Sequence, residues 1–70
     1  MVTIDTSYDI PIAIEDGKEI AKVDTTYSND IKVILTDRDE KYIQRFFVAT
    51  PLKDLVERTI MMRSIGVESL

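Results

Sequence analysis

Hydrophobic and polar residues alternate over the first part of the chain. Between residues 2 and 14 the even positions carry most of the large apolar side chains, and the odd positions are mainly polar or small. A period of two is typical of a strand with one buried face. The pattern predicts one strand, clearest over residues 8–14, with Ile10, Ile12 and Ile14 in the core. The proline within it favours a position at a sheet edge.

A tight hairpin is predicted directly after this strand. Asp16-Gly17 lies between two apolar runs, and glycine adopts the positive φ of such a turn at little cost. The turn leads into a second strand over residues 19–25. The alternation there is too poor to fix the register, although a loop of two or four residues would place Ile12 opposite Ala21.

Residues 31–36 form the third predicted strand, with Ile31, Val33 and Leu35 inward and Ile34 on the outer face. Residues 41–49 fit two structures. Their aromatic and β-branched content favours a fourth strand, whereas apolar side chains at i, i+3 and i+4 fit a helix. We favour the strand and keep the helix as the alternative.

The last element is predicted to be a helix from Pro51 to about Ser64. Thr50 is the expected N-cap, Pro51 suits the first helical position, and Gly66 is expected to end the helix in a left-handed conformation. Apolar side chains at helical spacing form a stripe that should face the core. The stripe consists of Leu52, Leu55, Val56, Thr59, Ile60 and Met62.

These elements predict one small α+β domain spanning residues 1–70. We expect an antiparallel four-stranded meander with the C-terminal helix packed on one face, in the order ββββα. The alternative is three strands plus two helices. The expected core consists of Ile10, Ile12, Ile14, Val23, Ile31, Val33, Leu35, Phe46, Val48, Leu52, Leu55, Val56, Ile60 and Met62.

Two apolar side chains of the helix fall outside the core stripe. Met61 and Ile65 project roughly opposite to it, on the side that carries Arg58. They are either scattered surface residues or part of a second apolar patch that binds another protein. A chain of 70 residues buries a small core, so a partner would stabilise it. The expected interface therefore comprises Met61, Ile65, Ile34 and Arg58.

The composition removes most catalytic chemistry from consideration. The chain has no cysteine and no histidine, so it cannot build a Cys-His or Ser-His pair or an imidazole or thiolate metal site. Its two glycines are too few for a phosphate-binding loop. The carboxylates of Asp37, Asp39 and Glu40 are best explained as turn residues. We therefore expect no enzyme, no metal and no cofactor.

The charge is uneven along the chain. The net charge is −4, and residues 1–40 hold ten of the thirteen acidic residues but four of the nine bases. One alternative is an acidic decoy or inhibitor, of the kind made by phages or mobile elements, that binds a basic site on a nucleic-acid-handling protein. Its acidic face would consist of Asp5, Asp9, Asp16, Asp24, Asp30 and Asp39.

A weaker alternative is single-stranded nucleic-acid binding. Bases and aromatics are interleaved in residues 41–47, which could stack unpaired bases. This set consists of Lys41, Tyr42, Arg45, Phe46 and Phe47. The net acidity makes a nucleic-acid partner the less favoured hypothesis.

The chain lacks the apolar run of a membrane span and the pattern of a signal peptide, so we expect a cytoplasmic protein with no membrane contact. No motif resembles a known family. The favoured hypothesis is a small non-enzymatic protein–protein interaction module, accessory or structural in role, that self-associates as a homodimer.

Overall fold

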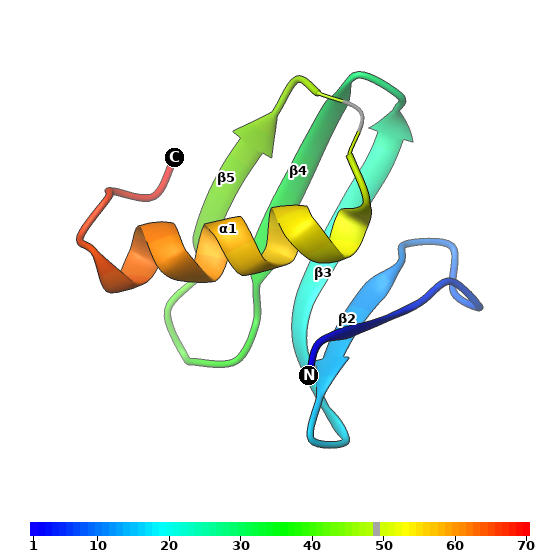
Figure 1. Cartoon of the computed structure of the whole chain (residues 1–70), viewed down its shortest axis with the longest axis horizontal. Coiled ribbons are helices and arrows are strands. Elements are labelled where there is room, and N and C mark those ends of the chain that lie inside the picture. Colours follow the sequence, from blue (N-terminus) through cyan, green and yellow to red (C-terminus); the bar gives the residue numbers. More distant parts are fainter. Residues whose placement is uncertain (49) are drawn as a thin grey trace.

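The computed structural model describes residues 1–48 and 50–70, and it contains five strands and one helix (Figure 1). The strands pair antiparallel in the order β1-β2-β3-β4-β5, and helix α1 crosses one face of the sheet (Figure 1). The elements are β1 (Thr3–Asp5), β2 (Ile12–Glu15), β3 (Lys18–Tyr27), β4 (Asp30–Leu35), β5 (Tyr42–Phe46) and α1 (Leu52–Ser64). The α+β class is confirmed, but the prediction of four strands was wrong.

The additional strand arises because the predicted first strand is two strands. β1 and β2 pair directly, with Thr3 opposite Ile14 and Asp5 opposite Ile12. Residues 6–11 connect them. Asp5 Oδ1 starts this connection by accepting the Ser7 N–H at 2.9 Å and the Ser7 hydroxyl at 2.6 Å. Such a local side-chain hydrogen bond turns the backbone, and it ends the strand that the alternation predicted to continue.

The Asp16-Gly17 hairpin is confirmed, with φ of 54° and 76° at its two turn residues. The register beyond it was not predicted. Ile14 lies opposite Glu19, but Ala13 lies opposite Ala21, so a β-bulge leaves Ile20 without a partner on β2. The extra residue moves Ile12 one position along, opposite Lys22.

This shift turns β2 over relative to the prediction. Ala13 is fully buried in the core, whereas Ile12 and Ile14 lie on the face of the sheet away from α1. Their assignment to the core was wrong. Ile10, in the β1–β2 connection, is 47% exposed, so its assignment was also wrong.

The predictions for β4 and β5 were better. Ile31, Val33 and Leu35 are buried and Ile34 lies on the outer face, as expected. Tyr42–Phe46 is a strand, so the helical alternative for residues 41–49 was wrong. Val48 is 47% exposed and does not belong to the core. Ala49, the last residue of that range, lies outside the described residues.

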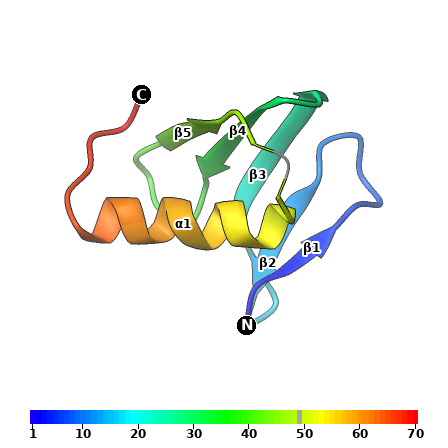
Figure 2. The same cartoon turned by 45° about the horizontal axis from the view of Figure 1, so that its top comes forward.

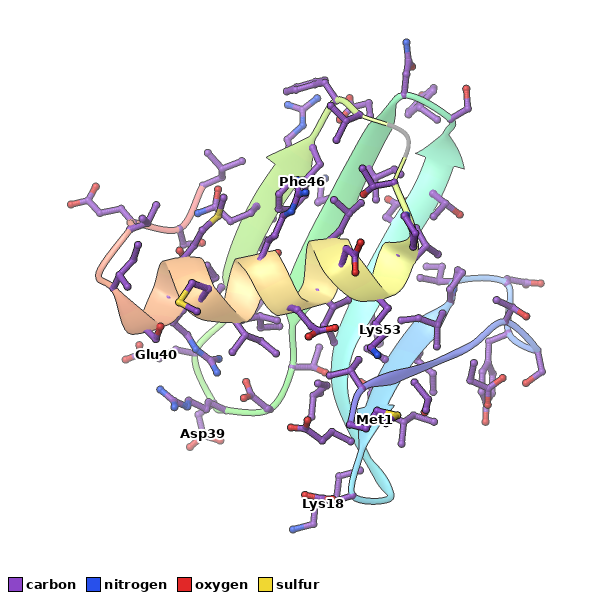
Figure 3. The ribbon with its side chains drawn as sticks, in the orientation of Figure 1. Met1, Lys18, Asp39, Glu40, Phe46 and Lys53 are labelled. Atoms are coloured by element: carbon purple, nitrogen blue, oxygen red, sulfur yellow. The ribbon has the colours of Figure 1, made fainter. Side chains whose placement is uncertain are left out.

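The core lies between the inner face of the sheet and α1. Phe46 extends from β5 over this inner face toward the helix (Figure 3). Leu52, Ile60 and Met62 are partly buried against the core, which confirms the predicted helix stripe. The buried apolar residues are Val2, Ala13, Ala21, Val23, Ile31, Val33, Leu35, Tyr42, Phe46, Leu55 and Val56.

The two ends of α1 differ in how well they were predicted. Pro51 is the cap residue, and its carbonyl accepts the Asp54 N–H at 3.0 Å. Thr50 Oγ1 makes no hydrogen bond to the described residues, so the predicted Thr50 cap was wrong. The C-terminal prediction is confirmed: Gly66 has φ of +89° and its N–H bonds to the Arg63 carbonyl.

Candidate interaction surface

The face of the sheet that points away from α1 carries no helix of the described chain (Figure 2). Strand alternation and register assign the side chains of this open sheet face. They are Thr3, Asp5, Ile12, Ile14, Glu19, Lys22, Asp24, Asp30, Lys32, Ile34, Ile43 and Arg45. Each strand contributes at least two of them, so the face is continuous across the sheet.

Isoleucines form the centre of the open sheet face. Ile34 and Ile43 are directly opposite each other on β4 and β5. Lys22 lies opposite both Ile34 and Ile12, so one row crosses four strands as Ile12, Lys22, Ile34 and Ile43. All three isoleucines are partly buried by their neighbours but lie outside the core cluster. An apolar centre on an uncovered sheet is typical of a binding surface.

One ion pair, between Arg45 and Asp30, lies beside the isoleucines on the same face. The Arg45 guanidinium donates from Nε to Asp30 Oδ1 at 3.1 Å and from Nη2 to Asp30 Oδ2 at 2.5 Å. These hydrogen bonds lower the pKa of the Asp30 carboxyl and raise the pKa of Arg45. Both groups therefore stay charged near neutral pH.

The other acids on this face also have partners. The Thr26 hydroxyl donates to Asp24 Oδ1 at 2.6 Å, and this bond is the main cause that lowers the pKa of Asp24. Glu19 Oε2 accepts the Thr36 hydroxyl at 2.8 Å. Polar groups that already have partners cost less to bury in an interface than unpaired ones.

Two exposed aromatic side chains lie at the end of the open sheet face that is next to the β3–β4 turn. Tyr27 and Phe47 are each 67% exposed. Tyr27 lies opposite Asp30, and the Arg45 Cζ atom is 5.4 Å from the centroid of the Phe47 ring, a cation–π distance. Aromatic residues and arginine are the types enriched in protein–protein interfaces.

A groove of about 440 Å³ adjoins the isoleucine row. The β1–β2 connection forms one wall with Tyr8, which is 60% exposed, and Ile10. The sheet forms the other wall. The complete lining consists of Tyr8, Asp9, Ile10, Ile12, Glu19 and Lys22. The groove extends the apolar area of the open sheet face beyond the strands.

The four expected interface residues lie on two different faces. Met61 and Ile65 are 60% and 70% exposed on the outer side of the helix layer, where Arg58 is also exposed. Ile34 lies on the open sheet face, on the other side of the molecule. Met61 also borders a shallow hollow of about 300 Å³ between α1 and the pair Val2 and Glu15. The structure therefore does not bring Ile34 together with the helix residues.

The six residues of the expected acidic face are also dispersed. Asp5, Asp24 and Asp30 belong to the open sheet face, where each accepts hydrogen bonds within the chain. Asp16 lies in the β2–β3 turn, and Asp39 lies in the β4–β5 connection (Figure 3). Asp9 lies in the β1–β2 connection.

The base and aromatic set of residues 41–47 is divided between the two faces. Tyr42 and Phe46 are 8% exposed and face the core, whereas Arg45 and Phe47 belong to the outer side. Sequence reasoning missed Ile43 and Phe47 as surface residues of one patch. The signal was present, because Ile43, Arg45 and Phe47 occupy alternate positions and must share a face if the segment is a strand.

Neither a metal-ligand cluster nor a membrane-spanning helix is present in the described residues. Residues 1–48 and 50–70 contain no group of three or more acidic side chains arranged to hold a metal ion. In the same residues no helix is long and apolar enough to cross a membrane. No family model matches the chain, and no curated protein or solved structure is significantly similar to it.

Proposed function

We propose that this chain is a non-enzymatic protein–protein interaction module that forms a homodimer through its open sheet face. The observation that carries the proposal is the row of Ile12, Ile34 and Ile43 on a face that α1 leaves uncovered. Burying these side chains against a second copy removes apolar surface from water, which is the main driving force of association.

The size of the face suits a second copy. The molecule measures 30 × 28 × 19 Å, and its two layers stack along the shortest axis (Figure 1). The broad face is therefore comparable with the roughly 800 Å² per partner that a standard interface buries. An isologous dimer uses the same face on both copies, so one such patch on each chain is sufficient.

The charge of the face also favours self-association. The whole chain carries a net charge of −4, but Lys22, Lys32 and Arg45 on the open sheet face are nearly balanced by the acids around them. Two copies that meet through this face bring together nearly neutral surfaces and keep the excess negative charge outside. This face carries at least as many acids as bases, with Arg45 paired to Asp30 and Lys32 opposite Asp24, which disfavours binding of a nucleic-acid backbone there.

Sedimentation velocity or light scattering at micromolar concentration tests the proposal. We expect a dimer for the parent chain and a monomer for Ile34→Asp, because a buried unpaired carboxylate disrupts the apolar centre. Ile34 lies outside the core, so the fold should persist in the variant, as circular dichroism would check.

Met61→Asp is the matched control, since it places the same charge on the exposed helix patch. It should leave the dimer intact. A parent chain that is monomeric at about 100 μM, well above the dissociation constant of a specific dimer, would refute the proposal. If Met61→Asp dissociates the dimer and Ile34→Asp does not, the interface lies on the helix side instead.

A further inference from the structure

The groove beside β2 and the outer row of β5 lie on opposite sides of the open sheet face. The outer row of β5 consists of Ile43, Arg45 and Phe47, which occupy alternate positions. Strands β3 and β4 separate β2 from β5, so the groove and the outer row are about 14 Å apart, or three strand spacings (Figure 1). The outer row therefore cannot enter the groove of its own chain.

The groove and the outer row have complementary shapes. The groove has a volume of about 440 Å³, and Tyr8 and Ile10 contribute apolar surface to its wall. In the outer row Phe47 is 67% exposed, and the Cζ atom of the exposed Arg45 is 5.4 Å from the centroid of its ring. Burial of an aromatic side chain removes about 150–250 Å² of surface from water. A second copy of the chain can therefore supply an apolar occupant for the groove.

The charge of the open sheet face changes from one side to the other. On the groove side, β1 and the β1–β2 connection carry Asp5 and Asp9 and no base. On the opposite side, β4 and β5 carry Lys32 and Arg45 against Asp30. The groove side is therefore acidic, whereas the side with the outer row of β5 has an excess of positive charge.

Two symmetric arrangements of face-to-face copies combine these charges differently. A twofold axis perpendicular to the strands places β1 on β1 and β5 on β5, which brings like charges together. An axis parallel to the strands places the acidic side of one copy on the basic side of the other. Because opposed like charges disfavour a complex, charge selects the parallel axis, while apolar burial supplies the affinity.

The isoleucine row fixes the position of this axis across the sheet. From β2 to β5 the row reads Ile12, Lys22, Ile34 and Ile43. An axis along β3 would place Lys22 against Lys22 of the second copy, where the two charges repel each other. An axis between β3 and β4 places Ile12 on Ile43 and the aliphatic part of Lys22 on Ile34, so apolar groups meet along the whole row.

We propose that the two copies are related by this axis, so that β5 of one copy lies over β2 of the other and its outer row fills the groove. This inference rests on the proposed homodimer and specifies its orientation. Ile43 packs on Ile12 of the second copy. The Arg45 guanidinium uses two of its five N–H donors for Asp30 and directs the others toward Asp9 in the groove of the second copy.

Cross-linking of single-cysteine variants tests this orientation in the full chain. The parent chain has no cysteine, so Ile12→Cys and Ile43→Cys each carry one thiol and every link joins two chains. The probe is a short bis-maleimide, because packed sheets are about 10 Å apart and a disulfide needs a closer approach. One variant is isotopically labelled, so mass spectrometry separates mixed links from links between identical variants.

In an equimolar mixture we expect mixed links to exceed links between identical variants at least about fivefold. The proposed axis places position 12 on position 43, whereas it separates identical positions by about 14 Å across the sheet. Ile12 and Ile43 lie outside the core cluster, so the sheet should persist in both variants, as circular dichroism would check. Met61→Cys in place of Ile43→Cys is the matched control and should give background linking only.

Sedimentation of the parent chain separates a failure of this orientation from a failure of the homodimer. A monomeric parent refutes both proposals. If the parent is a dimer, two results overturn the orientation alone. One is that identical variants link as efficiently as mixed ones, which indicates the perpendicular axis. The other is that mixed links stay at the level of the Met61→Cys control.

Discussion

Arg63 and Asp37 form the ion pair that joins the last turn of α1 to the β4–β5 connection. Their two hydrogen bonds measure 2.7 Å and 2.8 Å, and the two side chains are 18% and 28% exposed. The Arg63 guanidinium lowers the pKa of the Asp37 carboxyl, mainly through its hydrogen bonds. Paired, bidentate contacts of this kind are stronger than ordinary surface ion pairs.

The lowered pKa makes this pair sensitive to acid. Because the pKa of Asp37 is lower in the folded chain than its ordinary value near 3.8, the charged carboxylate stabilises the fold above that pH. We expect Asp37→Asn to lower the free energy of unfolding by about 1 kcal/mol at neutral pH. The difference from the parent chain should vanish as the pH falls through the lowered pKa.

Urea unfolding of both proteins at about pH 7 and about pH 2 measures this difference. Asp39→Asn, in the same connection, is the control, because Asp39 is exposed and forms no ion pair in the described chain. A stability difference for Asp37→Asn that stays constant down to the lower pH would contradict the assignment.

Single residues show where sequence reasoning succeeded and where it did not. The inward Ile31, Val33 and Leu35 and the outward Ile34 were predicted correctly. From Lys32 to Leu35, β4 pairs with both neighbours without a bulge, so alternation alone fixes the two faces. Ile12 was not. Its face depends on the bulge at Ile20, which adds one residue to β3 and leaves no mark in the pattern of hydrophobic positions.

At the scale of elements, the helix and the hairpin were predictable and the first strand was not. Asp16-Gly17 and Gly66 have direct conformational signals, since each turn needs positive φ. The division of the first strand into β1 and β2 depends on the hydrogen bonds of Ser7 to Asp5, in a stretch whose alternation continues through the connection. The open sheet face could be predicted only in part, because it needs the register of all five strands.

The end of α1 provides a test at this scale. Gly66 has φ of +89° and a Cβ atom there would meet nothing within 4 Å, so Gly66→Ala strains the backbone without a clash. We expect a loss of about 1 kcal/mol in the free energy of unfolding and faster hydrogen exchange at the Leu70 amide. The reason is that the turn positions residues 67–70, where the Leu70 N–H bonds to the Ile43 carbonyl at 2.9 Å.

Gly17→Ala is the matched control for this variant, since Gly17 has φ of +76° and equally open surroundings. In urea unfolding this variant should lose a similar free energy of unfolding. Hydrogen exchange at its Leu70 amide should not become faster than the loss of global stability alone explains. Equal acceleration of Leu70 exchange in both variants would mean that the turn at Gly66 has no local role in holding residues 67–70 against Ile43.

At the scale of the whole molecule, the distribution of charge distinguishes the proposed homodimer from an acidic decoy. Each copy carries a net charge of −4, so two copies repel each other at long range. At the proposed interface the Arg45–Asp30 pair and its neighbours are nearly balanced, and apolar burial supplies the attraction. Binding to a basic site would instead depend on unscreened acidic charge.

Salt therefore separates the two mechanisms. The screening length falls to about 3 Å at about 1 M sodium chloride. Between about 0.05 M and about 1 M salt we expect the dissociation constant of the dimer to stay the same or to decrease. Sedimentation equilibrium of the parent chain measures it, with Ile34→Asp as the monomeric reference at both concentrations. A dissociation constant that rises tenfold or more in high salt would show that opposite charges hold the copies together. The central role would then pass from the isoleucine row to the ion pairs around it, because only the latter weaken when charge is screened.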